Sequence, residues 1–202
     1  MPIHTIIFDL GAVLIDWNPR YLYRKILKDE EEVTWFLNTI CTSEWNDKQD
    51  AGRSFEEATA ELVALHPEWE IAIRAWYDRW EETIPGALED SVKILETLKA
   101  TGKYKMYALT NWSERTFPWA LKTFPFLHWF DGIVVSGVEK TRKPFPEIYH
   151  ILFDRYHVNP SEALFIDDNI KNIEGGKAVG LQTIHFTSAQ QLQLALNGLG
   201  VL

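Results

Sequence analysis

Short apolar segments recur along the chain at intervals that suit a parallel β-sheet. The first, residues 3–8, is β-branched and apolar on both sides of the pleat, and comparable segments occupy residues 105–109, 132–135, 163–166 and 181–186. Strands that are apolar on both faces are typical of a buried parallel sheet. All but the last are followed by polar residues and then by a helical pattern. This alternation predicts an α/β fold, a three-layer Rossmann-like core around a parallel sheet.

Only helical patterns occur between the first and second predicted strands. Asn18 and Pro19 begin one helix, which we expect to continue to about residue 27, and Asp29 caps the next. Further helical segments follow at residues 43–52, 54–65 and 68–83. We therefore predict an α/β core formed by residues 1–16 and 85–202, with an inserted all-helical cap formed by residues 17–84.

Tryptophan is concentrated in the predicted cap, since six of the nine tryptophans lie between residues 17 and 80. Aromatic side chains bury large areas efficiently, so the packing of a small helical core explains them better than a ligand cage does. The sequence does not separate a buried aromatic stripe from an exposed one. A monomer and a homodimer therefore both stay open.

Composition and charge narrow the class of protein. Among the 202 residues, 46% are hydrophobic and 24% charged, which is typical of a globular chain. The net charge of −9 disfavours nucleic acid as a partner, and the lone Cys41 excludes an internal disulfide and a four-cysteine zinc site. No apolar run approaches the ~20 residues of a membrane span, and the start of the chain lacks an export-signal pattern. We expect a cytoplasmic protein without a membrane partner.

Acidic residues end two of the predicted strands, at the edge of the sheet where ligands bind in doubly wound folds. Asp9 closes the first strand beside Gly11, a position suited to nucleophilic attack or to metal binding. Asp167 and Asp168 close the strand at residues 163–166. Adjacent carboxylates usually need a cation or hydrogen-bond donors to stay ionised. An aspartate that merely caps a turn is the alternative in each case.

Two further groups of polar residues lie where we expect the same edge of the sheet. Thr110 and Asn111 end the strand at residues 105–109, next to the start of a helix, where small polar groups can hold an anion. Lys143 precedes the helix at residues 147–156 and can neutralise a phosphoryl group. A helix cap and a solvated surface lysine are the alternatives.

In this order, the four signals resemble the motifs of the haloacid dehalogenase superfamily, and the helical block lies where that superfamily carries its cap. The resemblance implies that Asp9 is a nucleophile that forms a covalent aspartyl intermediate. It implies that Thr110 donates to the transferring phosphoryl group while Asn111 supports the loop. Lys143 would pair with the nucleophile and with the phosphoryl oxygens.

The resemblance also implies a Mg²⁺ cofactor. Its ligands would be Asp9, Asp168 and the backbone carbonyl of Gly11, with Asp167 either supporting them or serving as an alternative ligand. A hard cation and a lysine together offset charge, so that one anion can attack another.

Gly11 departs from the pattern of most phosphatases of this superfamily, which carry a second aspartate two residues after the nucleophile. That aspartate protonates the leaving oxygen and then helps to activate water, and such help is worth about 10²–10⁴-fold. The stretch FDLGAVLID is similar to bacterial phosphatases that hydrolyse α-D-glucose 1-phosphate. An anomeric phosphate depends less on protonation, so we expect a small phosphorylated metabolite, above all a sugar phosphate. Asp16 or a cap residue is an alternative proton source.

Two other functions stay open. A 2-haloacid dehalogenase also lacks the second aspartate, because halide leaves without a proton, but it uses no magnesium and would not need the acidic pair at Asp167 and Asp168. A catalytically impaired member that binds a phosphorylated ligand or a partner protein is the third possibility. The intact set of Asp9, Thr110, Lys143 and Asp168 argues against it.

Substrate choice is expected to depend on the cap. Arg20 and Arg53 can reach a polar or anionic substrate, and Trp45, Gln49 and Asp50 lie near the turn that precedes Arg53. Trp112 directly follows the Thr110–Asn111 pair and can form a wall of the pocket. A solvated face or packing within the cap is the alternative for each of these side chains.

Overall fold

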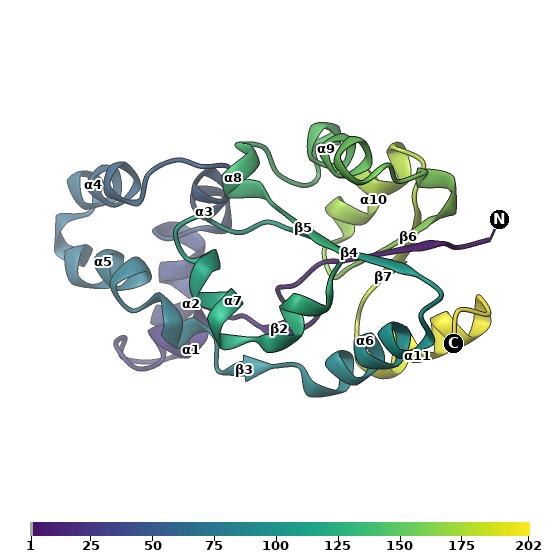
Figure 1. The fold of residues 1–202 in the computed structure, drawn as a ribbon. Helices are drawn as coiled ribbons and strands as arrows, with labels where there is room; N and C mark the ends of the chain where they lie inside the picture. The colour runs from purple at the N-terminus through teal and green to yellow at the C-terminus, as the bar shows by residue number, and fades with distance from the viewer. Residues whose placement is uncertain (1) are drawn as a thin grey trace.

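A five-stranded parallel sheet forms the centre of the protein, which we describe from a computed structural model covering residues 2–202 (Figure 1). The strands, in the spatial order β5-β4-β1-β6-β7, are β1 (Thr5–Phe8), β4 (Lys105–Thr110), β5 (Gly132–Val135), β6 (Ala163–Asp167) and β7 (Gln182–His185). All five coincide with the apolar segments of the sequence to within two residues at each end. The predicted α/β fold with a parallel sheet is therefore confirmed.

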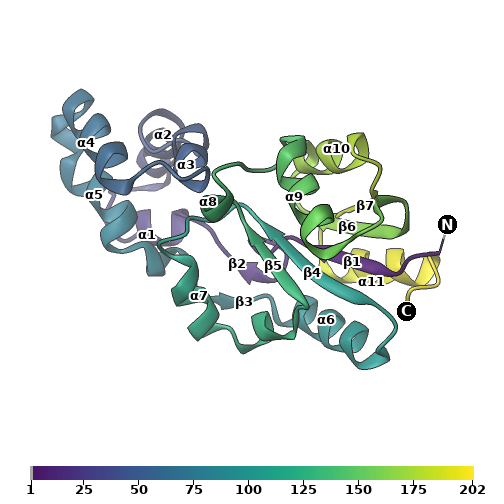
Figure 2. The same cartoon turned by 45° about the horizontal axis from the view of Figure 1, so that its top comes forward.

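Helices cover both faces of the sheet, which gives three layers (Figure 2). One face is covered by α6 (Glu89–Thr101), α7 (Phe117–Thr123) and α11 (Ala189–Gly198), and the other by α9 (Pro146–Tyr156) and α10 (Ile170–Ala178). The shorter helical turns of this part are η3 (Pro125–Trp129), α8 (Ser136–Glu139) and η4 (Pro160–Glu162).

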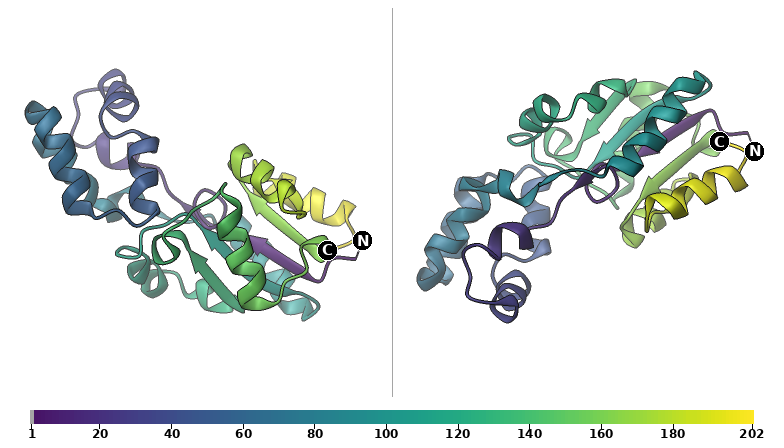
Figure 3. Two further views of the ribbon diagram at one scale, coloured as in Figure 1. Left: turned by 90° about the horizontal axis from the view of Figure 1, so that it is seen from above. Right: turned by 90° about the horizontal axis from the view of Figure 1, so that it is seen from below.

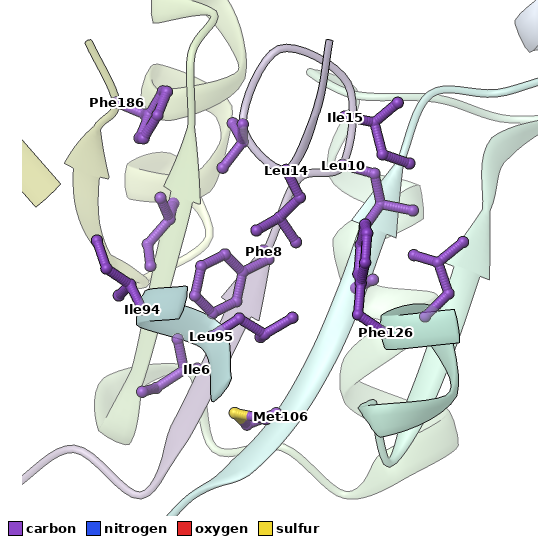
Figure 4. Packing of buried hydrophobic residues seen from close by; sticks show 14 of the residues in the cluster. Ile6, Phe8, Leu10, Leu14, Ile15, Ile94, Leu95, Met106, Phe126 and Phe186 are labelled. Atoms are coloured by element: carbon purple, nitrogen blue, oxygen red, sulfur yellow. The ribbon is translucent and has the colours of Figure 1, made fainter. Parts of the chain in front are cut away.

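The pleat of β1 explains why the sheet is buried on both faces. Successive side chains of a strand point to opposite faces, and here Ile6 and Phe8 pack in one core cluster while Ile7 packs in the other. Figure 4 shows Phe8 beside Leu95 of α6. On the far face, Ile7 shares its cluster with Ile148 of α9. Burial of both rows removes apolar area from water and fixes the strand register.

The strand register brings the chemically interesting strand ends together. Phe8 is aligned with Ala108 of β4 and with Ile166 of β6, so the residues that follow these positions emerge at one edge of the sheet. Asp9, Thr110 and Asp167 are these residues or lie close to them. A single edge therefore carries the residues singled out in the sequence.

The helical block is inserted between β2 (Ile15–Asp16) and β3 (Gly86–Ala87), which pair antiparallel where the chain leaves the core and returns. Its elements are α1 (Arg20–Tyr23), α2 (Glu30–Thr39), α3 (Ser43–Asp50), α4 (Phe55–Leu65), η1 (Pro67–Trp69), α5 (Glu70–Asp78) and η2 (Trp80–Thr83). Figure 3 shows the block at one end of the molecule and both termini at the other. We propose that residues 17–84 are a separate domain and call them the cap.

Two cap helices differ from their predicted extent. The helix expected at residues 18–27 is regular only over α1 and continues as turns, and the one expected at residues 68–83 is divided into η1, α5 and η2. The predicted cap at Asp29 is confirmed, because its side chain accepts from the Glu32 N–H at 2.9 Å. Asn18 is not the N-cap of α1, since that position is taken by Pro19. Trp45 and Trp76 are buried in the helical core, as expected. Within residues 2–202, no helix has the length and apolar character needed to cross a membrane.

Candidate active site

The centre of the site is a buried lysine held between two buried carboxylates. Lys143 Nζ lies 2.8 Å from Asp9 Oδ1 and donates to Asp167 Oδ2 at 2.6 Å. The side chains of Lys143 and Asp167 are fully buried, and that of Asp9 is 11% exposed. A fully buried ammonium group needs such partners, because an uncompensated charge in the interior is strongly unfavourable.

Asn111 fixes the backbone of Lys143 to the end of β4. Its Nδ2 donates to the Lys143 carbonyl at 3.0 Å, and its Oδ1 accepts from the Lys143 N–H at 2.9 Å. This reciprocal pair brings together two loops that are 32 residues apart in the chain. Thr110 is buried directly before it, as the last residue of β4. The placement of Asn111 is thus the one that a loop-supporting residue requires.

The two adjacent carboxylates have different environments. Asp167 accepts from Asn172 Nδ2 at 3.1 Å and from the backbone N–H of Asn169 at 2.8 Å, besides the contact with Lys143. Asp168 is exposed, and its backbone carbonyl lies 2.8 Å from His185 Nε2. Asp167 is therefore fixed by its neighbours, whereas the carboxylate of Asp168 remains accessible from the edge of the sheet.

Burial dominates the electrostatics of this centre. It raises the pKa of Asp9 above its usual range, against the lowering effect of Lys143, and the charges of Asp167 and Asp168 raise it further. Burial alone would lower the pKa of Lys143, but Asp167 and Asp9 outweigh this and raise it. Although Asp168 is exposed as a residue, partial desolvation of its carboxyl group raises its pKa, and the charge of Asp167 raises it further. Lys143 is thus held in its charged form beside an excess of carboxylates.

A cavity of about 80 Å³ between cap and core adjoins this centre. The core contributes Gly11, Asn111, Trp112, Ser113 and Thr116, and residues 17–84 contribute Trp17, Asn46, Asp50, Phe55, Tyr77 and Trp80. The cavity combines five aromatic side chains with several hydrogen-bonding groups, which is the usual composition of a small-molecule site. The cap and the core thus border a space that reaches the loop after β1, which carries Asp9 and Gly11.

Three residues were predicted to contact substrate, and the structure places them differently. Trp112 lines the cavity. Arg53 lies nearby in the cap, where its Nε donates to Gln49 Oε1 at 2.8 Å and its Nη1 pairs with Glu61. Arg20 lies on α1, where its Nη1 contacts Glu30 Oε2 at 3.2 Å and Thr34 Oγ1 at 3.1 Å. The geometry thus brings only Trp112 of these three to the described wall of the cavity.

The family pattern of haloacid dehalogenase-like hydrolases matches residues 3–180, which is most of the chain. The chain belongs to this family of hydrolases. It is 29% identical to a sesquiterpene phosphatase from Aspergillus oryzae, over 91% of this chain and 89% of that protein. It is 25% identical to the D-ribitol-5-phosphate phosphatase of Bacteroides thetaiotaomicron, over 96% of this chain and 99% of that protein.

Solved structures agree with the fold of this hydrolase. A haloacid dehalogenase family enzyme from Bacteroides thetaiotaomicron, in complex with magnesium and inorganic phosphate, superposes with a TM-score of 0.66. The match covers 92% of this chain and 95% of the other at 22% identity. This likeness establishes the shared fold of core and insertion.

The acidic cluster of the hydrolase fits a magnesium ion. Asp9, Asp167 and Asp168 each offer a carboxylate oxygen, and these oxygens lie within 4.8 Å of one another. Hard divalent cations prefer such oxygen ligands. Three carboxylates share the single ammonium group of Lys143, so a cation would compensate the remaining negative charge. When bound, Mg²⁺ would supply positive charge next to the reacting oxygens.

Asp168→Ala is expected to weaken Mg²⁺ binding at least about tenfold with little loss of stability, because Asp168 is exposed. A ligand at 100 times its Kd stabilises a fold by about 2.7 kcal/mol. Thermal unfolding with and without Mg²⁺ therefore measures the effect. The shift in melting temperature should be present in the wild type and much reduced in the variant, and an equal shift in both would place the ion elsewhere.

Several residues of the site were not predicted. Asn172 and Arg142 are the clearest examples: Asn172 donates to Asp167, and Arg142 Nη1 donates to the Lys143 carbonyl at 2.9 Å. Arg142 Nη2 also lies 3.0 Å from Asp47 Oδ2 of the cap. The signal for Asn172 was its place on the first turn of the helix that follows Asp167. For the Arg142–Asp47 pair no local pattern exists, because the partners are far apart in the chain.

Proposed function

We propose that this hydrolase releases inorganic phosphate from a small phosphate monoester through a covalent aspartyl phosphate at Asp9. The observation that carries the proposal is the position of Lys143 Nζ, 2.8 Å from Asp9 and 2.6 Å from Asp167, beside three carboxylates that can hold Mg²⁺. With Mg²⁺ bound, two sources of positive charge would lie next to the proposed nucleophile, Asp9. Such fixed charges act where negative charge develops in the transition state.

Each residue then has a role in two displacements. Asp9 attacks phosphorus, the bond from phosphorus to the leaving oxygen breaks, and the alcohol departs with a proton. Water then attacks the aspartyl phosphate, which releases phosphate and restores the Asp9 carboxylate. Lys143 and the hydroxyl of Thr110 would bind the phosphoryl oxygens, and the Gly11 carbonyl, Asp9 and Asp168 would hold the ion. Asp167 would orient Lys143 through its short hydrogen bond.

Charge favours this reaction over dehalogenation. The cluster contains the carboxylates of Asp9, Asp167 and Asp168 against the ammonium group of Lys143. A metal-free dehalogenase would have to keep this excess negative charge beside its own nucleophile. With a cation the same cluster is balanced, so the acidic pair supports a metal-dependent phosphatase.

A sugar or polyol phosphate is the substrate class that we propose first. The cavity offers hydrogen-bonding groups from Asn46, Asp50, Ser113 and Thr116, which suit several hydroxyl groups. A relative that spans nearly the whole chain acts on D-ribitol 5-phosphate by name. Within this class, α-D-glucose 1-phosphate is the specific candidate that the FDLGAVLID stretch suggests.

An apolar phosphate ester is a second candidate, and the aromatic side chains of the cavity favour it. Trp17, Phe55, Tyr77, Trp80 and Trp112 present large apolar surfaces to a bound molecule. The relative from Aspergillus oryzae is a sesquiterpene phosphatase by name. The same walls can pack against the apolar face of a sugar ring, so the two classes have to be compared directly.

A panel of esters tests both candidates. Phosphate release is measured from α-D-glucose 1-phosphate, ribitol 5-phosphate, farnesyl monophosphate and 4-nitrophenyl phosphate, with Mg²⁺ and with a chelator. We expect Mg²⁺-dependent release, with kcat/KM for a sugar or polyol phosphate at least about tenfold above that for farnesyl monophosphate, a difference of about 1.4 kcal/mol. The reverse order would select the apolar class. Release from none of the four esters would contradict the phosphatase proposal.

A further inference from the structure

Position 11 opens toward the cavity instead of carrying a proton donor. Gly11 lines the cavity, and apart from its two chain neighbours no residue of 2–202 would have an atom within 4 Å of a Cβ at this position. The space that a side chain would occupy two residues after Asp9 is therefore open. A proton donor can enter this space from the opposite wall, which the cap provides.

Asp50 is the acidic side chain on that wall. It is the last residue of α3, it is half-buried, and it lines the same cavity as Gly11 and Asn111. Its Oδ2 accepts a hydrogen bond from Asn46 Nδ2 at 3.0 Å, a neutral partner. Within residues 2–202, Asp50 forms no ion pair, whereas Asp47 on the same helix pairs with Arg142. A carboxyl group without a cationic partner can carry a proton near neutral pH.

The end of α3 is docked on the loop that carries the catalytic lysine. Asp47 contacts Arg142, and Arg142 donates to the backbone carbonyl of Lys143, so a chain of two contacts links α3 to Lys143. At the turn after Asp50, Gly52 has a φ of +96° and lies so close to the Lys140 side chain that a Cβ would come within 2.3 Å of it. Only glycine combines this backbone conformation with so close an approach. The position of Asp50 over the site is thus determined by packing.

We propose that Asp50 of the cap is the acid–base residue of this hydrolase, replacing the aspartate that is missing at position 11. The proposal rests on the phosphatase reaction argued above. As Asp9 attacks phosphorus and the ester bond breaks, the proton of the Asp50 carboxyl group transfers to the leaving oxygen, which departs as an alcohol. When water attacks the aspartyl phosphate, its proton passes to the Asp50 carboxylate. The cycle returns Asp50 to its protonated form.

The electrostatic surroundings agree with this role. Burial raises the pKa of Asp50 to about 7, Asp47 and Asp9 raise it as well, and Arg142 opposes them. General acid–base catalysis is most effective when the pKa of the group is near the working pH.

The test compares leaving groups that need a proton with one that does not. The wild type and Asp50→Asn are assayed for kcat/KM on the better of ribitol 5-phosphate and farnesyl monophosphate, both esters of primary alcohols, and on 4-nitrophenyl phosphate, whose phenolate leaves unaided. We expect kcat/KM for the alkyl ester to fall about 10²-fold or more, within the range for general acid catalysis, and that for the aryl ester to fall less than about threefold. An equal fall for both esters, or a fall for neither, would overturn the proposal.

Two further variants make the result specific. Glu44→Gln removes one charge from the exposed face of the same helix and should leave both kcat/KM values within about twofold of the wild type. Asp16→Asn tests the other acid near the cap junction, whose carboxylate accepts from the Tyr21 hydroxyl at 3.0 Å. If Asp16→Asn, and not Asp50→Asn, shows the selective loss for the alkyl ester, the proposal is wrong. Failure of the wild type on all esters would instead contradict the phosphatase itself.

Discussion

Asp9→Asn is expected to lower kcat by on the order of 10⁴-fold or more while the protein stays folded. The amide has nearly the same shape as the carboxylate but cannot attack phosphorus. The fold should tolerate it, because burial raises the pKa of Asp9 and its charge is therefore a cost to the native state at neutral pH. Lys143 also keeps its hydrogen bond to Asp167. Turnover of 4-nitrophenyl phosphate and urea unfolding at pH 7 measure the two effects.

An exposed aspartate gives the matched control for this substitution. Asp154 lies on the solvent side of α9, so Asp154→Asn should change neither kcat nor the free energy of unfolding by a measurable amount. Incubation of the Asp9 variant with substrate should also leave no phosphate covalently attached to the protein. If Asp9→Asn keeps more than about a tenth of the wild-type kcat, Asp9 is not the nucleophile and the mechanism fails at its first step.

The core of this fold can be predicted from the sequence because the apolar pattern of each strand agrees with its burial in the sheet. Residues 105–109 and 163–166 are apolar on both faces, and a strand of that kind is stable only inside a covered parallel sheet. The parallel register then requires Asp9, Thr110 and Asp167 to emerge at the same edge. Motif recognition adds the expected chemistry, but convergence of these residues follows from the strands alone.

The cap is harder to predict from the sequence, because contacts between distant segments determine where its helices end and which side chains face the core. The periodic residues 68–83 predict one helix, yet the chain is divided at Arg79, where Trp80 packs against Trp112 of the core with ring centroids 5.7 Å apart. The position of Asp50 relative to the core could not be predicted from the sequence for the same reason. Its place at the end of a short helix is visible in the sequence, but its approach to Gly11 depends on Asp47, Arg142 and the turn at Gly52. Such contacts between distant segments leave no local pattern.

Lys143→Met is expected to lower both activity and stability. Removal of one partner from a buried, hydrogen-bonded charge pair typically costs about 3–5 kcal/mol, because the remaining charges lose their compensation. Here Asp9 and Asp167 would face each other without the ammonium group that now lies 2.8 and 2.6 Å from them. We also expect a loss in kcat of about 10²–10³-fold or more, as for the removal of a fixed group that stabilises charge in the transition state.

The pH dependence of this loss separates charge compensation from simple packing. Without Lys143, the pKa of Asp9 rises further, because the lowering effect of the ammonium group is lost. A group whose pKa is raised by folding lowers stability as the pH rises through that value. The destabilisation should therefore be larger at pH 8 than at pH 5, where the Asp9 carboxylate can take up a proton. Lys177→Met, which removes a lysine from the exposed pair with Glu174, should change the free energy of unfolding by less than about 1 kcal/mol at both pH values. Urea unfolding at the two pH values checks this, and an equal loss at both would show that Lys143 acts through its methylene chain, not its charge.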